Sequence, residues 1–262
     1  MIRSSSIPLL AITVALCLII MPILVVVGVA FSSGDFFLFP PPGFSFRWFR
    51  EFFTNDALMQ AFRLSIVLAL TAATSATALG VMAALYVSRR KGGLANTLQL
   101  LFMAPLVFPT IILGLALLIY FKMLGVGVLT GLSVAHTVVV MPYAFRSALA
   151  ALQSFDPVLE EAGQSLGASP LRTFFLVTLP NIWPGVLAGW LFGFVVSFGE
   201  LNTSLFLTGP GMTTLPIEIF SRLQFEGSQL VIAAASAVQV GLIVLLVLVI
   251  ERMIGIARIV QR

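Results

Sequence analysis

Long apolar stretches alternate along the chain with short segments that hold most of the charged, proline and glycine residues. A helix that crosses a bilayer needs about 20 mostly apolar residues, and six stretches meet this requirement. They cover residues 8–31, 61–87, 94–121, 128–152, 183–207 and 230–250. The pattern therefore predicts an all-α integral membrane bundle of six transmembrane helices, built as one domain over residues 1–262.

The composition agrees with a surface that faces lipid. Hydrophobic residues make up 60% of the 262 residues and charged residues 9%, whereas about 25% of the residues in soluble domains are charged. The net charge of +4 comes from dispersed basic residues without an aromatic-laced basic stripe, so we expect no nucleic-acid partner. The first apolar stretch far exceeds the roughly 7–15 residues of a signal-peptide core, which predicts a retained membrane anchor.

Lysine and arginine in the loops predict the orientation, because cytoplasmic loops carry the excess of both residues. With the N-terminus inside, nine basic residues lie on the cytoplasmic side and five on the outer side. The inner set is Arg3, Arg89, Arg90, Lys91, Arg146, Arg172, Arg252, Arg258 and Arg262, and the outer set is Arg47, Arg50, Arg63, Lys122 and Arg222. We therefore expect both termini to be cytoplasmic.

The outer segment 32–60 has a pattern of its own. Pro40–Gly43 stops any helix, and Phe46, Phe49 and Phe53 then recur at helical spacing. This spacing indicates either a short amphipathic helix that lies in the outer membrane interface, or a packed loop helix without a binding role.

Prolines and glycines also interrupt the apolar stretches themselves. The residues concerned are Pro105, Pro109, Pro142, Gly189, Gly193 and Gly199. Broken helices are tolerated in lipid where neighbouring helices or a cavity satisfy the freed backbone groups. Such breaks are typical of transport pathways, but they also occur in ordinary kinked helices.

Several kinds of catalytic chemistry are excluded by residue counts. The chain has one histidine, His136, and one cysteine, Cys17, so it holds neither a multi-histidine metal site nor an internal disulfide. The dipeptide Gly-Lys that a Walker A loop requires never occurs. We predict that the chain is not an enzyme by itself and binds no cofactor, and that a separate subunit binds any ATP.

The segment 154–181 predicts a compact pair of short helices. Asp156 can cap the first helix, and Gly167 can end it in the left-handed conformation. Ser169 followed by proline starts the second helix, which is expected to run to Pro180. An apolar stripe on the first helix consists of Phe155, Leu159, Ala162 and Leu166. This stripe fits either the groove of a partner or the membrane domain of the chain itself.

The motif E-A-G-x-x-L-G-A-S-x-x-x-x-F-x-x-V-x-L-P-x-x-x-P-G over residues 161–185 resembles the E-A-A loop of permease subunits from type I binding-protein-dependent ABC importers. The resemblance implies the type I permease fold, with a coupling helix that sits in a cleft of a cytoplasmic ATPase. The implied coupling residues are Glu160, Glu161, Ala162, Gly163, Leu166, Gly167 and Ala168. The chain departs from the family at Gly163, where alanine is usual.

The same resemblance implies the partners and the location. Two ABC ATPase subunits would bind ATP and Mg²⁺, a second homologous permease would complete the pathway, and a periplasmic binding protein would deliver the solute. The location would be the bacterial inner membrane, with lipid around the spans.

The stretch S-F-G-E-L-N-T-S-L-F-L-T-G-P-G-M-T-T-L-P-I-E-I-F-S over residues 197–221 resembles the second permease of spermidine/putrescine importers. Those relatives commonly carry an acidic pair where this chain has Gly199 and Glu200. The resemblance implies a polyamine-like solute, and an aminophosphonate, ferric iron or another small solute stays open as an alternative.

Glu200 is the ionisable residue best placed inside a span, where a carboxylate could attract an ammonium group. The expected substrate path consists of Glu200, Asn202, Thr203 and Ser204. The alternative is a structural acid with hydrogen bonds near a helix end, and we expect His136 to be a satisfied bundle histidine. A stand-alone secondary transporter and an intramembrane enzyme are rival functions, but the chain has no clear internal repeat and no pair of nucleophile and base.

Overall fold

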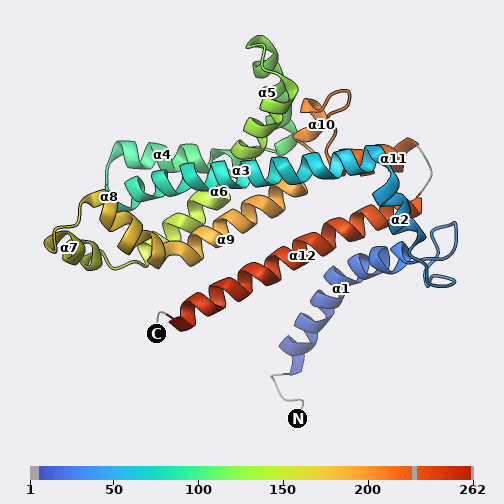
Figure 1. Cartoon of the computed structure of the whole chain (residues 1–262), viewed down its shortest axis with the longest axis horizontal. Helices are drawn as coiled ribbons and strands as arrows, with labels where there is room; N and C mark the ends of the chain where they lie inside the picture. Colours follow the sequence, from blue (N-terminus) through green and yellow to red (C-terminus); the bar gives the residue numbers. More distant parts are fainter. Residues whose placement is uncertain (1–5, 226–228, 261–262) are drawn as a thin grey trace. The chain divides into compact units, whose positions relative to one another are not determined.

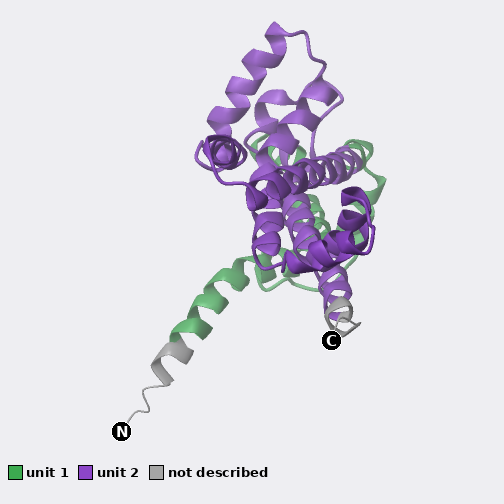
Figure 2. Ribbon diagram, turned by 90° about the vertical axis from the view of Figure 1, so that its left-hand side faces the viewer, with its two compact units in different colours: residues 1–60, 218–243 green, residues 61–217, 244–262 purple. Residues whose placement is uncertain are grey.

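The computed structural model describes residues 6–225 and 229–260, and within these ranges the chain is helical and contains no strand (Figure 1). The described chain divides into two compact units. Unit 1 comprises residues 1–60 and 218–243, and unit 2 comprises residues 61–217 and 244–262 (Figure 2). The long helices α3, Asp56–Arg89, and α12, Gln229–Val260, have residues in both units.

Unit 1 is built around the N-terminal helix α1, Ser6–Ala30. Side chains from residue 11 to residue 24 are all exposed, although this part is strongly apolar, as expected for a helix in lipid. The end of α1 is buried, because Val29 and Ala30 pack with Leu230 and Ala234 of α12. The other helices of the unit are α2, Arg47–Thr54, and most of α11, Leu215–Phe225.

Unit 2 contains the remaining helices. They are α4 (Gly93–Met103), the 3-10 turn Ala104–Leu106, α5 (Thr110–Met123), α6 (Val128–Gln153), α7 (Val158–Ser165), α8 (Pro170–Thr173), the π-helical turn Phe174–Thr178, α9 (Leu179–Phe198) and α10 (Ser204–Leu207). The helices α6 and α9 make an extensive contact with each other.

Small residues allow the helices of unit 2 to cross closely. A Cβ atom at Gly80 of α3 would lie 2.8 Å from the backbone nitrogen of Phe145 on α6. A Cβ at Gly189 of α9 would lie 3.1 Å from the Cα of Ala144, which is also on α6. Without a hydrophobic driving force in lipid, such close backbone approach is a main source of helix association.

The predicted third span is not one straight helix. Gly93–Leu106 and Thr110–Met123 are bent by 105°. The two prolines that flank the break, Pro105 and Pro109, have no N–H to continue the helical hydrogen bonds. By contrast, Pro142 is buried inside α6, which continues through it without a break. The structure therefore holds five candidate spans, or six if the bent pair is counted as one.

The predicted fifth span, 183–207, is shifted along the chain. The span is Pro170–Phe198, so the second loop helix does not end at Pro180 but runs into the membrane helix. A π-helical turn makes this passage, and Leu179 N–H donates to the carbonyl of Phe174. Since 29 residues of helix reach about 43 Å, the span is complete at Phe198, and residues 199–203 are free to unwind.

We expect Gly189→Leu to destabilise the bundle, because its side chain would collide with the backbone of α6. Overpacking of this kind costs about 1–3 kcal/mol or more. The thermal midpoint of the detergent-solubilised protein, followed by fluorescence-detected gel filtration, should fall. The matched control is Gly241→Leu on α12, where nothing lies within 4 Å of the added Cβ, and an equal loss in the control would contradict the packing argument.

Candidate functional site

The loop segment between α6 and α9 is held in shape by its own capping groups. Asp156 Oδ1 accepts the N–H of Val158 at 3.0 Å, at the start of α7. Gly167 ends that helix in the left-handed region with φ +87°, and Ala168 N–H donates to the Gly163 carbonyl at 3.2 Å. Ser169 Oγ then accepts the N–H of Arg172 at the start of α8. The predicted caps and the predicted turn are therefore confirmed.

The apolar stripe predicted on α7 divides in the structure. Phe155, just before the helix, packs against the core of unit 2 with Phe145 and Ile182. Leu159 is exposed, and Leu166 is 90% exposed. Glu161 and Ala162 are also exposed. The outer side of α7 therefore presents apolar and acidic groups together.

Glu160 lies on a different side of α7 and is bonded inside the chain. Its Oε1 accepts from the Arg89 guanidinium at 2.5 Å and also from the Thr178 hydroxyl. The Glu160 side chain is only 14% exposed. We call these three residues the clamp, because they join α7 to the end of α3 and to the π-helical turn before α9. Sequence reasoning grouped Glu160 with Glu161, but neighbouring helix residues point about 100° apart.

Gly163 and Ala168, the remaining coupling residues predicted on the loop, are both partly buried. A Cβ at Gly163 would meet the methyl groups of Thr173 and Val177 at 3.5 Å, which is an ordinary contact. The family's usual alanine therefore fits here, whereas Gly167 needs a backbone conformation that side chains disfavour.

The second candidate site is the unwound segment after α9. Glu200 is buried, and its Oε1 accepts the N–H of Thr203 at 2.9 Å. Asn202 Nδ2 donates to Thr110 Oγ1 at 3.1 Å, and Thr203 Oγ1 donates to the Thr110 carbonyl at 3.3 Å. Thr110 is the first residue of α5, directly after the Pro109 break. The segment after α9 thus donates hydrogen bonds to the start of α5, next to the break in the third span.

His136 joins this segment to the interior of the bundle. Its Nδ1 is 2.8 Å from Ser197 Oγ and its Nε2 is 2.9 Å from Ser204 Oγ. Because Ser204 Oγ donates to the Glu200 carbonyl at 3.1 Å, it must accept from the ring. We therefore assign the proton to Nε2, with Nδ1 accepting from Ser197. The predicted satisfied bundle histidine is confirmed, and Ser204 belongs to its network.

Sequence reasoning missed the partners of both sites. Arg89 was counted only as a basic residue that sets topology, although it pairs with Glu160 at a separation of 71 residues. Thr178, Thr110 and Ser197 carried no signal, because single hydroxyl residues are common in membrane helices. The adjacent acids Glu160 and Glu161 gave one hint of an internal partner, because neighbouring side chains on a helix point in different directions.

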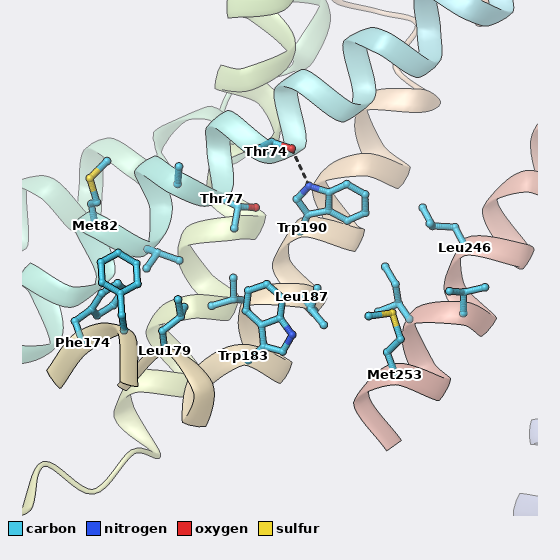
Figure 3. Close-up of a pocket in the computed structure, with 16 residues that line it drawn as sticks. Thr74, Thr77, Met82, Phe174, Leu179, Trp183, Leu187, Trp190, Leu246 and Met253 are labelled. Atoms are coloured by element: carbon cyan, nitrogen blue, oxygen red, sulfur yellow. Dashed lines mark hydrogen bonds between the residues drawn. The ribbon is translucent and has the colours of Figure 1, made fainter. Parts of the chain in front are cut away.

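An apolar groove of about 740 Å³ also lies in unit 2, between α3, α9 and the end of α12 (Figure 3). Figure 3 shows Trp183 of α9 and Met253 of α12 on opposite sides of it, and Trp190 donates to Thr74 Oγ1 at 3.1 Å. None of the lining residues is charged, so the groove does not fit a charged solute. Among the described residues, no three His, Cys, Asp or Glu side chains come together to hold a metal ion.

Breaking the clamp should loosen α7. In Glu160→Ala, Arg89 and Thr178 lose their acceptor, at a cost of about 1 kcal/mol because the arginine is half exposed. Hydrogen exchange of a peptide over residues 154–168 should then accelerate roughly fivefold. Glu161→Ala is the matched control, since Glu161 is exposed on the same helix; equal acceleration in both variants would refute the clamp.

Comparison with known proteins gives consistent results. The family model of the binding-protein-dependent transport system inner membrane component matches residues 76–258. The putrescine transport system permease protein PotI of Escherichia coli K12 is 39% identical over 192 residues, which are 70% of this chain and 68% of that protein. The spermidine/putrescine transport system permease protein PotC of the same strain is 31% identical over 217 residues, covering 82% and 81% of the two chains.

Among solved structures, the chain is similar to one from a bacterial ABC transporter involved in the import of the acidic polysaccharide alginate. The TM-score is 0.75 at 16% identity, and the match covers 95% of this chain and 94% of the other. This likeness concerns the fold alone, and it confirms the predicted all-α membrane architecture.

Proposed function

The chain belongs to the family of inner membrane components of binding-protein-dependent transport systems, and on this premise we propose that it is the permease subunit of an ATP-driven importer for a small polyamine-like cation. It forms half of the translocation pathway in the bacterial inner membrane, with both termini cytoplasmic. A second homologous permease forms the other half.

The observation that carries this proposal is the construction of α7. Its exposed Leu159 and Leu166 give a partner an apolar surface, and the clamp at Glu160 holds the helix to two membrane helices at once. A loop helix that served only to connect spans would need neither feature. Two cytoplasmic ATPase subunits, one on each permease, fit this surface and bind ATP and Mg²⁺, since the chain has no Gly-Lys for a Walker A loop.

The clamp can transmit the movement that ATP hydrolysis causes in the ATPase subunits to the membrane helices. When the ATPase subunits close, α7 moves with them. Arg89 and Thr178 carry the displacement to the end of α3 and to the π-helical turn that leads into α9. At its other end α9 stops at Phe198, where the unwound segment meets Thr110. A rigid helix thus joins the site of coupling to the candidate substrate path, as alternating access requires.

A cationic solute is supported by the chemistry of the second site. Glu200 is a buried carboxylate with one oxygen bonded to Thr203 N–H, and within the described part of the chain its Oε2 has no hydrogen-bond partner. An ammonium group could donate to that oxygen and to the exposed amide of Asn202. The two polyamine permeases reported above favour this solute class. A periplasmic binding protein delivers the solute to the outer face, which includes the segment over residues 209–229. This segment contains α11, and its residues 226–228 lie outside the described part of the chain.

Replacing Gly167 by valine should uncouple the importer. The residue has φ +87°, and a β-branched side chain there costs about 1–2 kcal/mol and reshapes the end of α7. We expect the variant to stay in the membrane, to lose ATP-dependent uptake of labelled putrescine and spermidine into vesicles, and to leave phosphate release independent of the loaded binding protein.

The matched control is Gly163→Ala on the same segment, which the ordinary contacts at that position should tolerate. Normal uptake by Gly167→Val would overturn the coupling assignment. Solute movement by the purified chain alone in liposomes would instead support a stand-alone secondary transporter.

Removing only the charge of Glu200 tests the substrate path. Glu200→Gln keeps an oxygen for Thr203 N–H, so folding should be unaffected. The loss of an ionic hydrogen bond of about 1–3 kcal/mol should raise the KM for polyamine uptake roughly tenfold. Glu251→Gln, an exposed acid at the other end of the bundle, should leave KM unchanged.

An unchanged KM in Glu200→Gln would remove Glu200 from the path without affecting the proposed class of transporter. Competition experiments with aminophosphonates and ferric chelates test the solute itself. Strong inhibition by either compound, without inhibition by unlabelled polyamines, would contradict the polyamine assignment.

A further inference from the structure

The loop that follows α1 closes on itself at its base. Ser45 N–H donates to the Phe31 carbonyl at 2.7 Å, and Ser33 N–H donates to the Gly43 carbonyl at 3.0 Å. These bonds bring the two ends of the loop together directly after the last turn of α1. Residues 36–46 therefore project as one unit from the end of that helix, and we call them the aromatic loop.

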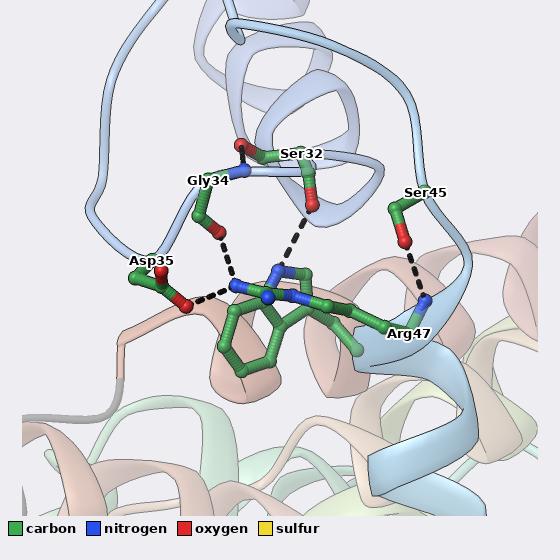
Figure 4. A network of polar contacts seen from close by, with 6 residues as sticks. Ser32, Gly34, Asp35, Ser45 and Arg47 are labelled. Carbon is green, nitrogen blue, oxygen red and sulfur yellow. Dashed lines mark hydrogen bonds and ion pairs between the residues drawn. The ribbon is translucent and has the colours of Figure 1, made fainter.

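Polar contacts fix this base firmly (Figure 4). The Arg47 guanidinium donates to the Gly34 carbonyl at 2.6 Å and pairs with Asp35. It also lies 4.2 Å from the centre of the Trp48 ring, whose Nε1–H donates to the Ser32 carbonyl at 3.0 Å. The charged and polar groups of the segment are thus used inside the base, and they leave the aromatic loop without a charged residue.

The aromatic loop instead exposes large apolar side chains. Phe44 is 84% exposed and Phe36 is 77% exposed. The complete set of exposed large side chains is Phe36, Phe37, Leu38, Phe39, Phe44 and Phe46. A large exposed apolar patch of this kind marks an interaction surface rather than an ordinary solvent-exposed surface.

Two contacts give the level of the aromatic loop along α1. The Phe39 ring lies 3.4 Å from the position of a Cβ on Gly28, in the last turn of the helix. Phe37 shares a cavity of about 320 Å³ with Val26, which lies two residues before Gly28 on the same helix. The loop thus folds back beside the end of an exposed and strongly apolar helix. Phe and Leu are among the side chains that interfacial segments bury at the boundary between headgroups and acyl chains.

The neighbouring helix α2 does not share this surface. Its Phe52 is buried, and Trp48 and Phe49 pack against the core of unit 1. Of the predicted stripe, only Phe46 and Phe53 are exposed. The packing of one side of α2 and the exposure of Phe53 fit both alternatives of the sequence prediction, and the larger exposed aromatic surface belongs to the loop before the helix.

We propose that the aromatic loop inserts into the headgroup region of the lipid leaflet at the C-terminal end of α1 and anchors that end of the helix. Lipid is favoured over a protein partner because the exposed rings continue the lipid-facing surface of α1 and carry no charge to specify a protein. The anchor does not depend on which solute is transported.

The test places an environment-sensitive fluorophore on single cysteines at Phe36 and Phe44, in a background where Cys17→Ser removes the one native cysteine. The full chain, with the subunits that co-purify, is reconstituted into liposomes of phosphatidylethanolamine and phosphatidylglycerol. These contain lipids with a nitroxide either near the headgroup or near the end of the acyl chain. Iodide serves as the aqueous quencher, and Glu51→Cys on α2 provides an exposed polar control.

We expect both loop labels to show blue-shifted emission, quenching by the shallow nitroxide more than by the deep one, and a loss of iodide quenching relative to the control. These properties should not change when a substrate-loaded binding protein is added. Iodide quenching equal to that of the control would overturn the proposal. Protection from both iodide and nitroxides would also overturn it, because it would identify a protein interface.

Discussion

Hydrocarbon offers no hydrogen-bond partners, and this constraint governs the breaks within the apolar spans and the irregular segments directly beside them. Continuous helices satisfy their own backbone, so a break persists only where neighbours replace the missing bonds. The unwound residues after Phe198 obey this rule through Glu200 and Thr110, each of which bonds Thr203. The segment after α9 is therefore bonded to the break of the third span, and this place, where polar groups gather, is the natural candidate for a solute path.

The chain has few charged residues, and two of its ion pairs each order a segment outside the apolar core. The pair between Arg89 and Glu160 connects α7 to the membrane helices, whereas the pair between Arg47 and Asp35 closes the base of the aromatic loop. In both places an ion pair orders a segment outside the apolar core and leaves apolar side chains exposed beside it. Exposed leucines on α7 suit an ATPase groove, and exposed phenylalanines after α1 suit a lipid headgroup layer.

Local structure followed the sequence closely wherever backbone chemistry alone decides it. Gly167 takes the left-handed conformation and Ser169 caps the next helix, because these preferences act within a few residues. The Pro105 and Pro109 break was also visible from the sequence, but its 105° bend was not. The prediction that the second loop helix ends at Pro180 was wrong, because the π-helical turn before this residue leads directly into α9.

Composition and short-range patterns suffice to predict the lipid environment, the all-α fold class, the family and the capped loop of the coupling segment. Contacts between distant segments show which acid is exposed, Glu161, and which is bonded inside the chain, Glu160. Tertiary packing also places His136 between Ser197 and Ser204, and it buries Phe52 of α2 while Phe36 and Phe44 of the loop stay exposed. Each of these depends on contacts between residues far apart in the chain, and such contacts arise from packing that no local pattern encodes.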